Sequence, residues 1–152
     1  MLKRHYEGQE ACSVAQVLEI IGERWSLLII RDAFLGLTKF DEFQESLGIA
    51  RNVLADRLKR LVDAGIFERV PYAERPPRYD YILTAKGRDL FTALNALRQW
   101  GDQHLSAKPM RLLRRKVDGR PVVAALVPAG SEALPQDEME LVPGPGFPRG
   151  DR

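Results

Sequence analysis

Residue types that are able to bind phosphate groups and the edges of nucleic-acid bases gather in two neighbouring stretches of the chain. Arg51 and Asn52 begin the first stretch, and arginine and asparagine form paired hydrogen bonds with guanine and adenine, respectively. Arg75 and Arg78 bracket a proline pair in the second stretch, where they suit phosphate or minor-groove contacts. The residues predicted to contact double-stranded DNA are Lys39, Arg51, Asn52, Arg57, Lys59, Arg60, Arg75 and Arg78.

The distribution of charge favours an anionic partner, although the formal net charge of the 152-residue chain is only +2. Residues 51–88 hold nine Lys/Arg against five Asp/Glu, and residues 111–120 hold five against one. The last 24 residues instead carry five acidic residues and two arginines. Basic stretches attract nucleic acid. An alternative is that the charged side of a helix is only its solvated face, and that Pro and Arg keep an exposed turn soluble.

Four helices are predicted to position the first basic stretch. Apolar residues recur there at intervals of three and four, which is the helical period. Ser13 and Thr38 are predicted N-caps, and Gly48 and Gly65 are predicted helix stops. The predicted helices cover residues 12–22, 25–35, 38–48 and 52–64.

The hydrophobic period then changes to two, which predicts a β-hairpin. Its strands are residues 66–70 and 79–83, and the connection over residues 71–78 is too long for a two-residue turn. A further helix is predicted over residues 85–105, with Thr84 as its N-cap. The apolar stripe of this helix is long for the end of a small domain, so it needs a partner surface. That stripe consists of Leu90, Leu94, Leu97 and Trp100.

The C-terminal third of the chain has weaker patterns. Asp118-Gly119 is a hairpin turn signal, and the segments around it are compatible with a second hairpin. Residues 128–152 hold five Pro and four Gly with few apolar residues, which predicts disorder. The predicted organisation is an N-terminal arm (1–11), a folded domain (12–105), an extension (106–127) and a disordered tail (128–152).

The order of elements predicts a winged helix-turn-helix, a mainly α fold with a small β-hairpin wing (α+β). Two short helices joined by Gly48-Ile49-Ala50 are followed directly by the basic hairpin. The second helix of such a pair fits the major groove of DNA, and the first braces it against the backbone. The hairpin would reach a neighbouring groove or phosphate.

The chain resembles the HxlR-type family of bacterial winged-helix transcriptional regulators, which are relatives of the MarR-type regulators. The resemblance covers about residues 9–105. It implies a homodimer built mainly from the first and last helices of the domain, bound to pseudo-palindromic operator DNA. The long Leu90–Trp100 stripe would then be buried between subunits. The segments that carry the resemblance are residues 12–15, 21–31, 40–43, 53–61, 64–65, 76–84 and 87–88.

Cys12, the single cysteine, matches a cysteine that many members of this family carry before the first helix. In some of them it senses oxidants or electrophiles, and the partial positive charge of a helix N-terminus stabilises a thiolate. Without a second cysteine, oxidation leads only to an intermolecular Cys12–Cys12 bridge, a mixed disulfide or an adduct. The alternative is a small apolar residue that packs at a helix start.

A pocket for a small apolar effector is conceivable beside the dimerisation helices, lined by Trp25, Leu28 and Phe91. The alternative is that these side chains only pack in the core. No metal or other cofactor is expected, because His5 and His104 are too few and too far apart for a site with Cys12.

Other protein classes are disfavoured. No apolar run is long enough for a membrane span or a signal peptide, and the lone cysteine favours a reducing compartment, so a cytoplasmic protein is expected. An enzyme is not expected, because no set of titratable residues converges. The main alternative is a winged-helix protein-interaction module that does not bind DNA, since Asp56 and Asp63 lie on the face that would meet the groove.

Overall fold

The computed structural model describes residues 6–148, and the chain divides into two compact units, Met1–Leu90 and Phe91–Arg152. Each unit is described by itself. No helix among the described residues is long and apolar enough to cross a membrane. The elements are α1 (Ser13–Ile21), α2 (Ser26–Phe34), α3 (Phe40–Leu47), α4 (Arg51–Asp63), β1 (Phe67–Glu74), β2 (Pro77–Leu83), α5 (Ala85–Arg88), α6 (Leu90–His104), β3 (Arg111–Arg115), a 3-10 turn (Gln136–Glu138) and β4 (Met139–Pro143).

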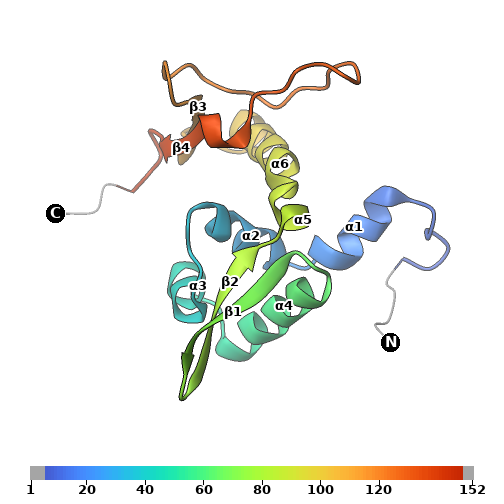
Figure 1. The fold of residues 1–152 in the computed structure, drawn as a ribbon. Helices are drawn as coiled ribbons and strands as arrows, with labels where there is room; N and C mark the ends of the chain where they lie inside the picture. The colour runs from blue at the N-terminus through green and yellow to red at the C-terminus, as the bar shows by residue number, and fades with distance from the viewer. Residues whose placement is uncertain (1–5, 149–152) are drawn as a thin grey trace. The chain divides into compact units, whose positions relative to one another are not determined.

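The first unit is a winged helix-turn-helix, as predicted: α1 to α4 precede an antiparallel hairpin of β1 and β2 that projects beyond α3 and α4 (Figure 1). Its core is one apolar cluster from α1 to α4 and the base of the hairpin. Phe43 of α3 and Phe67 of β1 meet edge to face there, with ring centroids 6.3 Å apart, a favourable aromatic geometry. A backbone hydrogen bond of 2.7 Å from Tyr81 to Thr38 fastens β2 to the start of α3.

Two of the predicted helix caps differ from the structure. Cys12, not Ser13, is the N-cap of α1, and Lys39, not Thr38, is the N-cap of α3. The side chain of Thr38 donates to Asp80 on β2 at 2.8 Å, while Glu42 accepts the backbone N–H groups of Thr38 and Lys39 at 2.9 and 3.0 Å. The Thr38 side chain is therefore bonded to the wing and does not cap α3. Glu42, in the first turn of α3, instead accepts hydrogen bonds from backbone N–H groups at the start of the helix.

The predicted N-cap Thr84 is confirmed, but the helix that it was expected to begin is interrupted. Thr84 accepts a hydrogen bond from the backbone N–H of Gly87 at 3.0 Å, as an N-cap should. The single helix expected over residues 85–105 is two helices, α5 and α6, that meet at Asp89.

The wing is longer than predicted. β1 continues to Glu74 and β2 begins at Pro77, so only Arg75-Pro76 connects the two strands. The expectation of a long loop over residues 71–78 is wrong. Prolines at 71 and 77 are compatible with the strands because a two-stranded ribbon has a free edge on both sides. The pairing shifts register between Pro71 and Ala73, where Tyr72 is the extra residue.

The second unit contains a sheet that local composition did not predict. β3 pairs with β4, so that Arg111 lies opposite Pro143 and Arg115 opposite Met139. The turn at Asp118-Gly119 does return the chain, with a bridge from Arg114 to Pro121, but residues 122–127 form no strand.

The prediction of disorder over residues 128–152 is therefore wrong for β4, while residues 149–152 lie outside the described part of the chain. The physical reason is that β4 pairs with β3, a segment far from it in the sequence whose charges and apolar residues complement its own. Arg114 pairs with Glu140 at 2.8 Å and Leu113 lies opposite Leu141. The basic strand β3 thus pairs with the acidic segment that contains Glu140, 26 residues after Arg114.

Candidate nucleic-acid interface

The connection between α3 and α4 sets the angle of the helix-turn-helix. Gly48 ends α3 with a φ of +60°, in the left-handed region that favours glycine. Ile49 then inserts its side chain into the core of the unit, so the turn cannot swing out. Ala50 is the N-cap of α4, which begins at Arg51.

The helix α4 has one buried face and one exposed ridge. Leu54, Leu58 and Leu61 are fully buried. The opposite side, which we call the α4 ridge, consists of Asn52, Asp56 and Lys59, all exposed, and the exposed Asp63 follows beyond it as the last residue of the helix. A helix held by its apolar face beside a wing presents such a ridge in the way that major-groove recognition requires.

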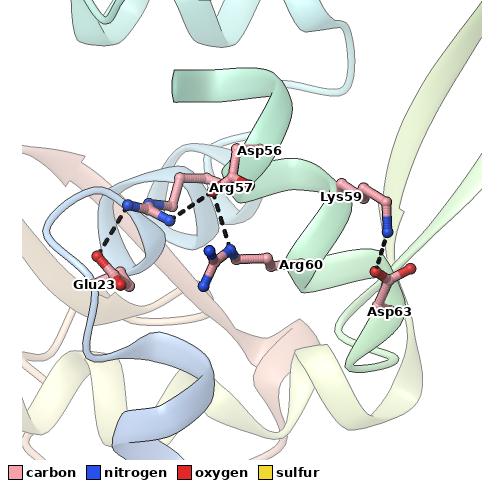
Figure 2. A network of polar contacts seen from close by, with 6 residues as sticks. All are labelled: Glu23, Asp56, Arg57, Lys59, Arg60 and Asp63. Atoms are coloured by element: carbon pink, nitrogen blue, oxygen red, sulfur yellow. Dashed lines mark hydrogen bonds and ion pairs between the residues drawn. The ribbon is translucent and has the colours of Figure 1, made fainter. Parts of the chain in front are cut away.

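Arg57 is turned away from the α4 ridge (Figure 2). Its guanidinium donates to Glu23 at 2.9 Å and to Asp56 at 2.8 Å, and its side chain is only 17% exposed. Glu23 lies in the connection between α1 and α2, so Arg57 fastens α4 to that connection. Sequence analysis missed Glu23, because no local pattern links residues 34 positions apart.

The two other cations in the body of α4 are also paired (Figure 2). Lys59 Nζ lies 2.5 Å from Asp63, and Arg60 Nε lies 3.0 Å from Asp56, each one helical turn from its partner. Lys59 remains 73% exposed and Arg60 40% exposed. The two acidic residues of α4 thus offset half of its four positive charges, so part of the attraction to a polyanion must come from elsewhere on the unit.

A groove of about 640 Å³ lies between the start of α3, the start of α4 and the wing, and cations line part of it. Three of the predicted cations, Lys39, Arg51 and Arg78, line it. Tyrosines of the wing line it as well; they are Tyr72, Tyr79 and Tyr81.

Lys39 and Arg51 are held at the groove by aromatic rings. Lys39 Nζ lies 3.3 Å from Asp80 and 5.1 Å from the centre of the Tyr72 ring, and the hydrogen bond to Asp80 raises the pKa of Lys39 above its ordinary value. Lys39 is therefore a permanent cation at neutral pH. The Arg51 guanidinium lies 4.6 Å from the centre of the Phe40 ring, a cation–π geometry, and it also donates to Asp41 at 3.4 Å.

The wing carries its own cations. Arg75 at the tip and Arg78 on β2 are exposed, and neither forms an ion pair with another residue in the described range 6–148. Arg69 on β1 stacks over Tyr79 at 4.7 Å, and sequence analysis missed it. The period-two alternation of the strand, read together with charge, was the available signal.

The remaining predicted site residues fall in both units. Cys12 is half-buried and its thiol is free. Trp25 and Leu28 are half-buried in the first unit, and Trp25 packs against its core. Phe91 is buried in the second unit. The effector pocket expected from these three aromatic and apolar residues stays a prediction.

The helix α6 presents two different faces. Asn95 is buried, and Arg98 pairs with Asp102 at 2.7 Å and donates to the carbonyl of Arg111 at 3.2 Å. On the other side, Leu97 and Trp100 are more than half exposed. Of the other residues in the predicted stripe, Leu94 is half-buried, and Leu90, which belongs to the first unit, packs against that unit's core.

The fold and the arrangement of its exposed cations define a winged helix-turn-helix protein of the transcriptional-regulator class. The model of the HxlR-like helix-turn-helix family matches residues 20–109. This chain belongs to that family.

Its relatives support the same class. It is 40% identical to the uncharacterized HTH-type transcriptional regulator Rv3095 of Mycobacterium tuberculosis, over 96% of this chain and 92% of the relative. The crystal structure of PA1607 is similar with a TM-score of 0.70 and 47% identity, over 86% of this chain and 93% of the other. The redox regulator HypR in its reduced form has a TM-score of 0.56 and 30% identity, over 59% and 90% of the two chains. The first two similarities cover more of the chain than the family model, which ends at residue 109.

Proposed function

We propose that this protein is a sequence-specific DNA-binding transcriptional regulator that acts as a homodimer on a pseudo-palindromic operator in the bacterial cytoplasm. The observation that carries the proposal is the exposed α4 ridge beside a groove and a wing that present cations: Lys39 and Arg51 are exposed although each is ring-stacked and ion-paired, and Arg75 and Arg78 have no ion pair within residues 6–148. In this proposal Arg51 and Asn52 contact base edges at the N-terminal end of α4.

The phosphate contacts divide into two groups. Arg75 and Arg78 form no ion pair within residues 6–148 and can follow the backbone at the wing, and Lys39, paired with Asp80 and 45% exposed, contacts a phosphate from the groove. Lys59 and Arg60 are exposed enough to reach phosphates beside the major groove while keeping their intrahelical partners. In this proposal Arg57, which the sequence suggested as a DNA contact, has the role of positioning α4, and its hydrogen bonds to Glu23 and Asp56 support that role.

The homodimer is supported by apolar side chains that the described part of each unit leaves exposed. On α1 these are Val14 and Val17, at 67% and 43% exposure, with Leu18 beside them; on α6 they are Leu97 and Trp100. Apolar stripes on two helices are costly in water and typical of subunit contacts. A second copy of the chain covers them in our proposal, which also supplies the second recognition helix for a palindromic site.

The test is a fluorescence-anisotropy titration of the full chain against its own upstream intergenic DNA, with excess unrelated DNA as competitor. We expect tight, competitor-resistant binding whose affinity falls steeply with salt, because binding releases counterions from the phosphates. Arg51→Ala should weaken binding about tenfold, whereas Arg120→Ala, which removes an exposed cation from the second unit, should not. Salt-insensitive or absent binding, together with a stable protein complex, would favour the protein-interaction module instead.

We propose a second, separate role for Cys12 as the point at which oxidants act. The similarity to HypR, a redox regulator, favours it, and the thiol is partly exposed at the start of α1. Treatment with a thiol oxidant should reduce DNA binding by the native chain and leave Cys12→Ser unaffected. Equal loss in both proteins would assign Cys12 to packing alone.

A further inference from the structure

We propose that Asp56 is a specificity-determining residue that reads a cytosine in each operator half-site. The inference rests on the proposed DNA-binding function and deepens it. It concerns a carboxylate on the very ridge that would face a polyanion, where an acidic residue first looks like an obstacle to binding.

The position of Asp56 suits a base contact. It lies one helical turn after Asn52 on the α4 ridge and is 49% exposed. Residues at this spacing on one helix face neighbour each other, and residues of the first turns of a recognition helix are those that reach base edges. Asp63 lies two turns further on, at the end of α4.

The polar network of Figure 2 makes a carboxylate at this position compatible with DNA. Arg57 Nη1 and Arg60 Nε both lie at the same oxygen of Asp56, Oδ2, at 2.8 and 3.0 Å. Two cations therefore offset the repulsion between this carboxylate and the phosphates. The other oxygen, Oδ1, accepts no hydrogen bond from any residue between 6 and 148.

The network also holds the carboxylate in place. Arg57 is anchored at its far side by Glu23 at 2.9 Å and is largely buried. One face of the Asp56 carboxylate is thus fastened to the body of the unit through Arg57, while Oδ1 is available to a donor. A side chain ordered before binding loses less entropy on contact.

Base chemistry selects cytosine as the partner. In the major groove cytosine presents only its N4 amino group, which donates a hydrogen bond to Asp or Glu. Adenine also presents an amino group, but its N7 acceptor lies beside it and would repel a carboxylate. Guanine and thymine present acceptors that would repel a carboxylate. Asn52, one turn away, is the residue type suited to adenine.

The experiment selects binding sites from a randomised duplex DNA library with the full-length wild type, Asp56→Asn and Asp63→Asn. Asn prefers adenine, so Asp56→Asn should replace one cytosine per half-site by adenine in the consensus. Anisotropy titrations on the two defined duplexes should show a wild-type preference for cytosine of about tenfold that Asp56→Asn abolishes or reverses. Asp63→Asn makes the same chemical change at an exposed position of the same helix and should keep the wild-type consensus.

The outcomes separate the inference from the function on which it rests. An unchanged consensus with Asp56→Asn, or the same change with Asp63→Asn, would overturn the role of Asp56 and leave DNA binding intact. A wild type that enriches no sequence would overturn the proposed function and this inference with it. Thermal unfolding of each variant checks that these exposed substitutions leave the fold in place.

Discussion

Arg57 and Arg75 are the same residue type in two environments, and the environments assign them different roles. Arg57 is largely buried between Glu23 and Asp56, where removing it would take the partner from Glu23 and leave Asp56 with Arg60 alone. Arg75 lies at the tip of the wing and forms no ion pair in the described range of the chain. Residue type alone marks both as cations, but burial and partners decide what each cation does.

This difference predicts two separable phenotypes. Arg57→Ala should lower the free energy of unfolding by about 1.5–3 kcal/mol, the range for hydrogen bonds to charged groups, as measured by urea denaturation. Arg75→Ala should leave stability unchanged and reduce the slope of log affinity against log salt by about 0.9, the effect of one lost phosphate contact. Equal effects of the two variants on stability and salt dependence would contradict the assignment.

At the scale of elements, Asp32 joins two helices. It is buried, its Oδ1 lies 2.7 Å from Arg31 Nη2, and its Oδ2 accepts a hydrogen bond from Ser46 of α3 at 2.7 Å. A buried carboxylate with these partners fixes the packing of α2 against α3, and hence the angle at which α4 follows.

Asp32→Ala should therefore destabilise the first unit by about 2 kcal/mol, because it removes charge-assisted hydrogen bonds and leaves Ser46 without its acceptor. Ser46→Ala removes only one of those bonds and should cost about 1 kcal/mol. Chemical denaturation of both variants measures the two values. A smaller loss for Asp32→Ala than for Ser46→Ala would show that the carboxylate does not hold these helices together.

The start of α3 gives a prediction for pH. Glu42 accepts two backbone N–H groups there, from Lys39 and Thr38, and these bonds hold the pKa of Glu42 below its ordinary value of 4.5. A carboxylate with a lowered folded-state pKa stabilises the fold above its unfolded-state pKa, and this contribution is lost as the pH falls through the folded-state pKa.

Glu42→Gln should thus be slightly less stable than the wild type at neutral pH, by about 0.5 kcal/mol for an exposed group at a helix N-terminus. The difference should shrink as the pH falls below 4.5 and through the lowered pKa of Glu42. Urea denaturation of both proteins across this pH range measures it. A difference that stays constant with pH would mean that the charge of Glu42 contributes nothing.

At the scale of the whole molecule, the exposed side of α6 bears on the oligomeric state. Leu97 and Trp100 are 55% and 57% exposed, whereas the opposite side of the same helix carries the buried Asn95 and the Arg98–Asp102 pair. The covered side carries these polar residues beside the buried Phe91, and apolar residues occupy the open side, where a helix of a monomeric protein usually carries polar ones.

Trp100→Asp should therefore convert a dimer into a single chain of 17.2 kDa, as measured by light scattering after size-exclusion chromatography. Burying a new charge in an apolar interface is strongly unfavourable. Val117→Asp introduces the same charge at an 81% exposed apolar residue of the second unit and should leave the dimer intact. A wild type that elutes as a single chain would contradict the proposed homodimer.

Much of the architecture follows from local patterns in the sequence. The helical period over α1 to α4, the stop signals at Gly48 and Gly65 and the change to period two are properties of neighbouring residues, so they predict a winged helix-turn-helix without tertiary information. Residue types and spacing likewise indicate DNA, because arginine, lysine and asparagine have a chemistry that does not depend on the fold.

Contacts between distant residues decided the rest. The Glu23–Arg57 bond spans 34 positions, and it gives Arg57 a partner and a burial that its residue type does not indicate. The pairing of β3 with β4 gives structure to a segment whose own composition predicts disorder. The Thr38 side chain donates to Asp80 of the wing, and the N-cap of α3 is Lys39 rather than the expected Thr38. In each case a partner far along the chain changes the outcome, and local periodicity carries no information about such partners.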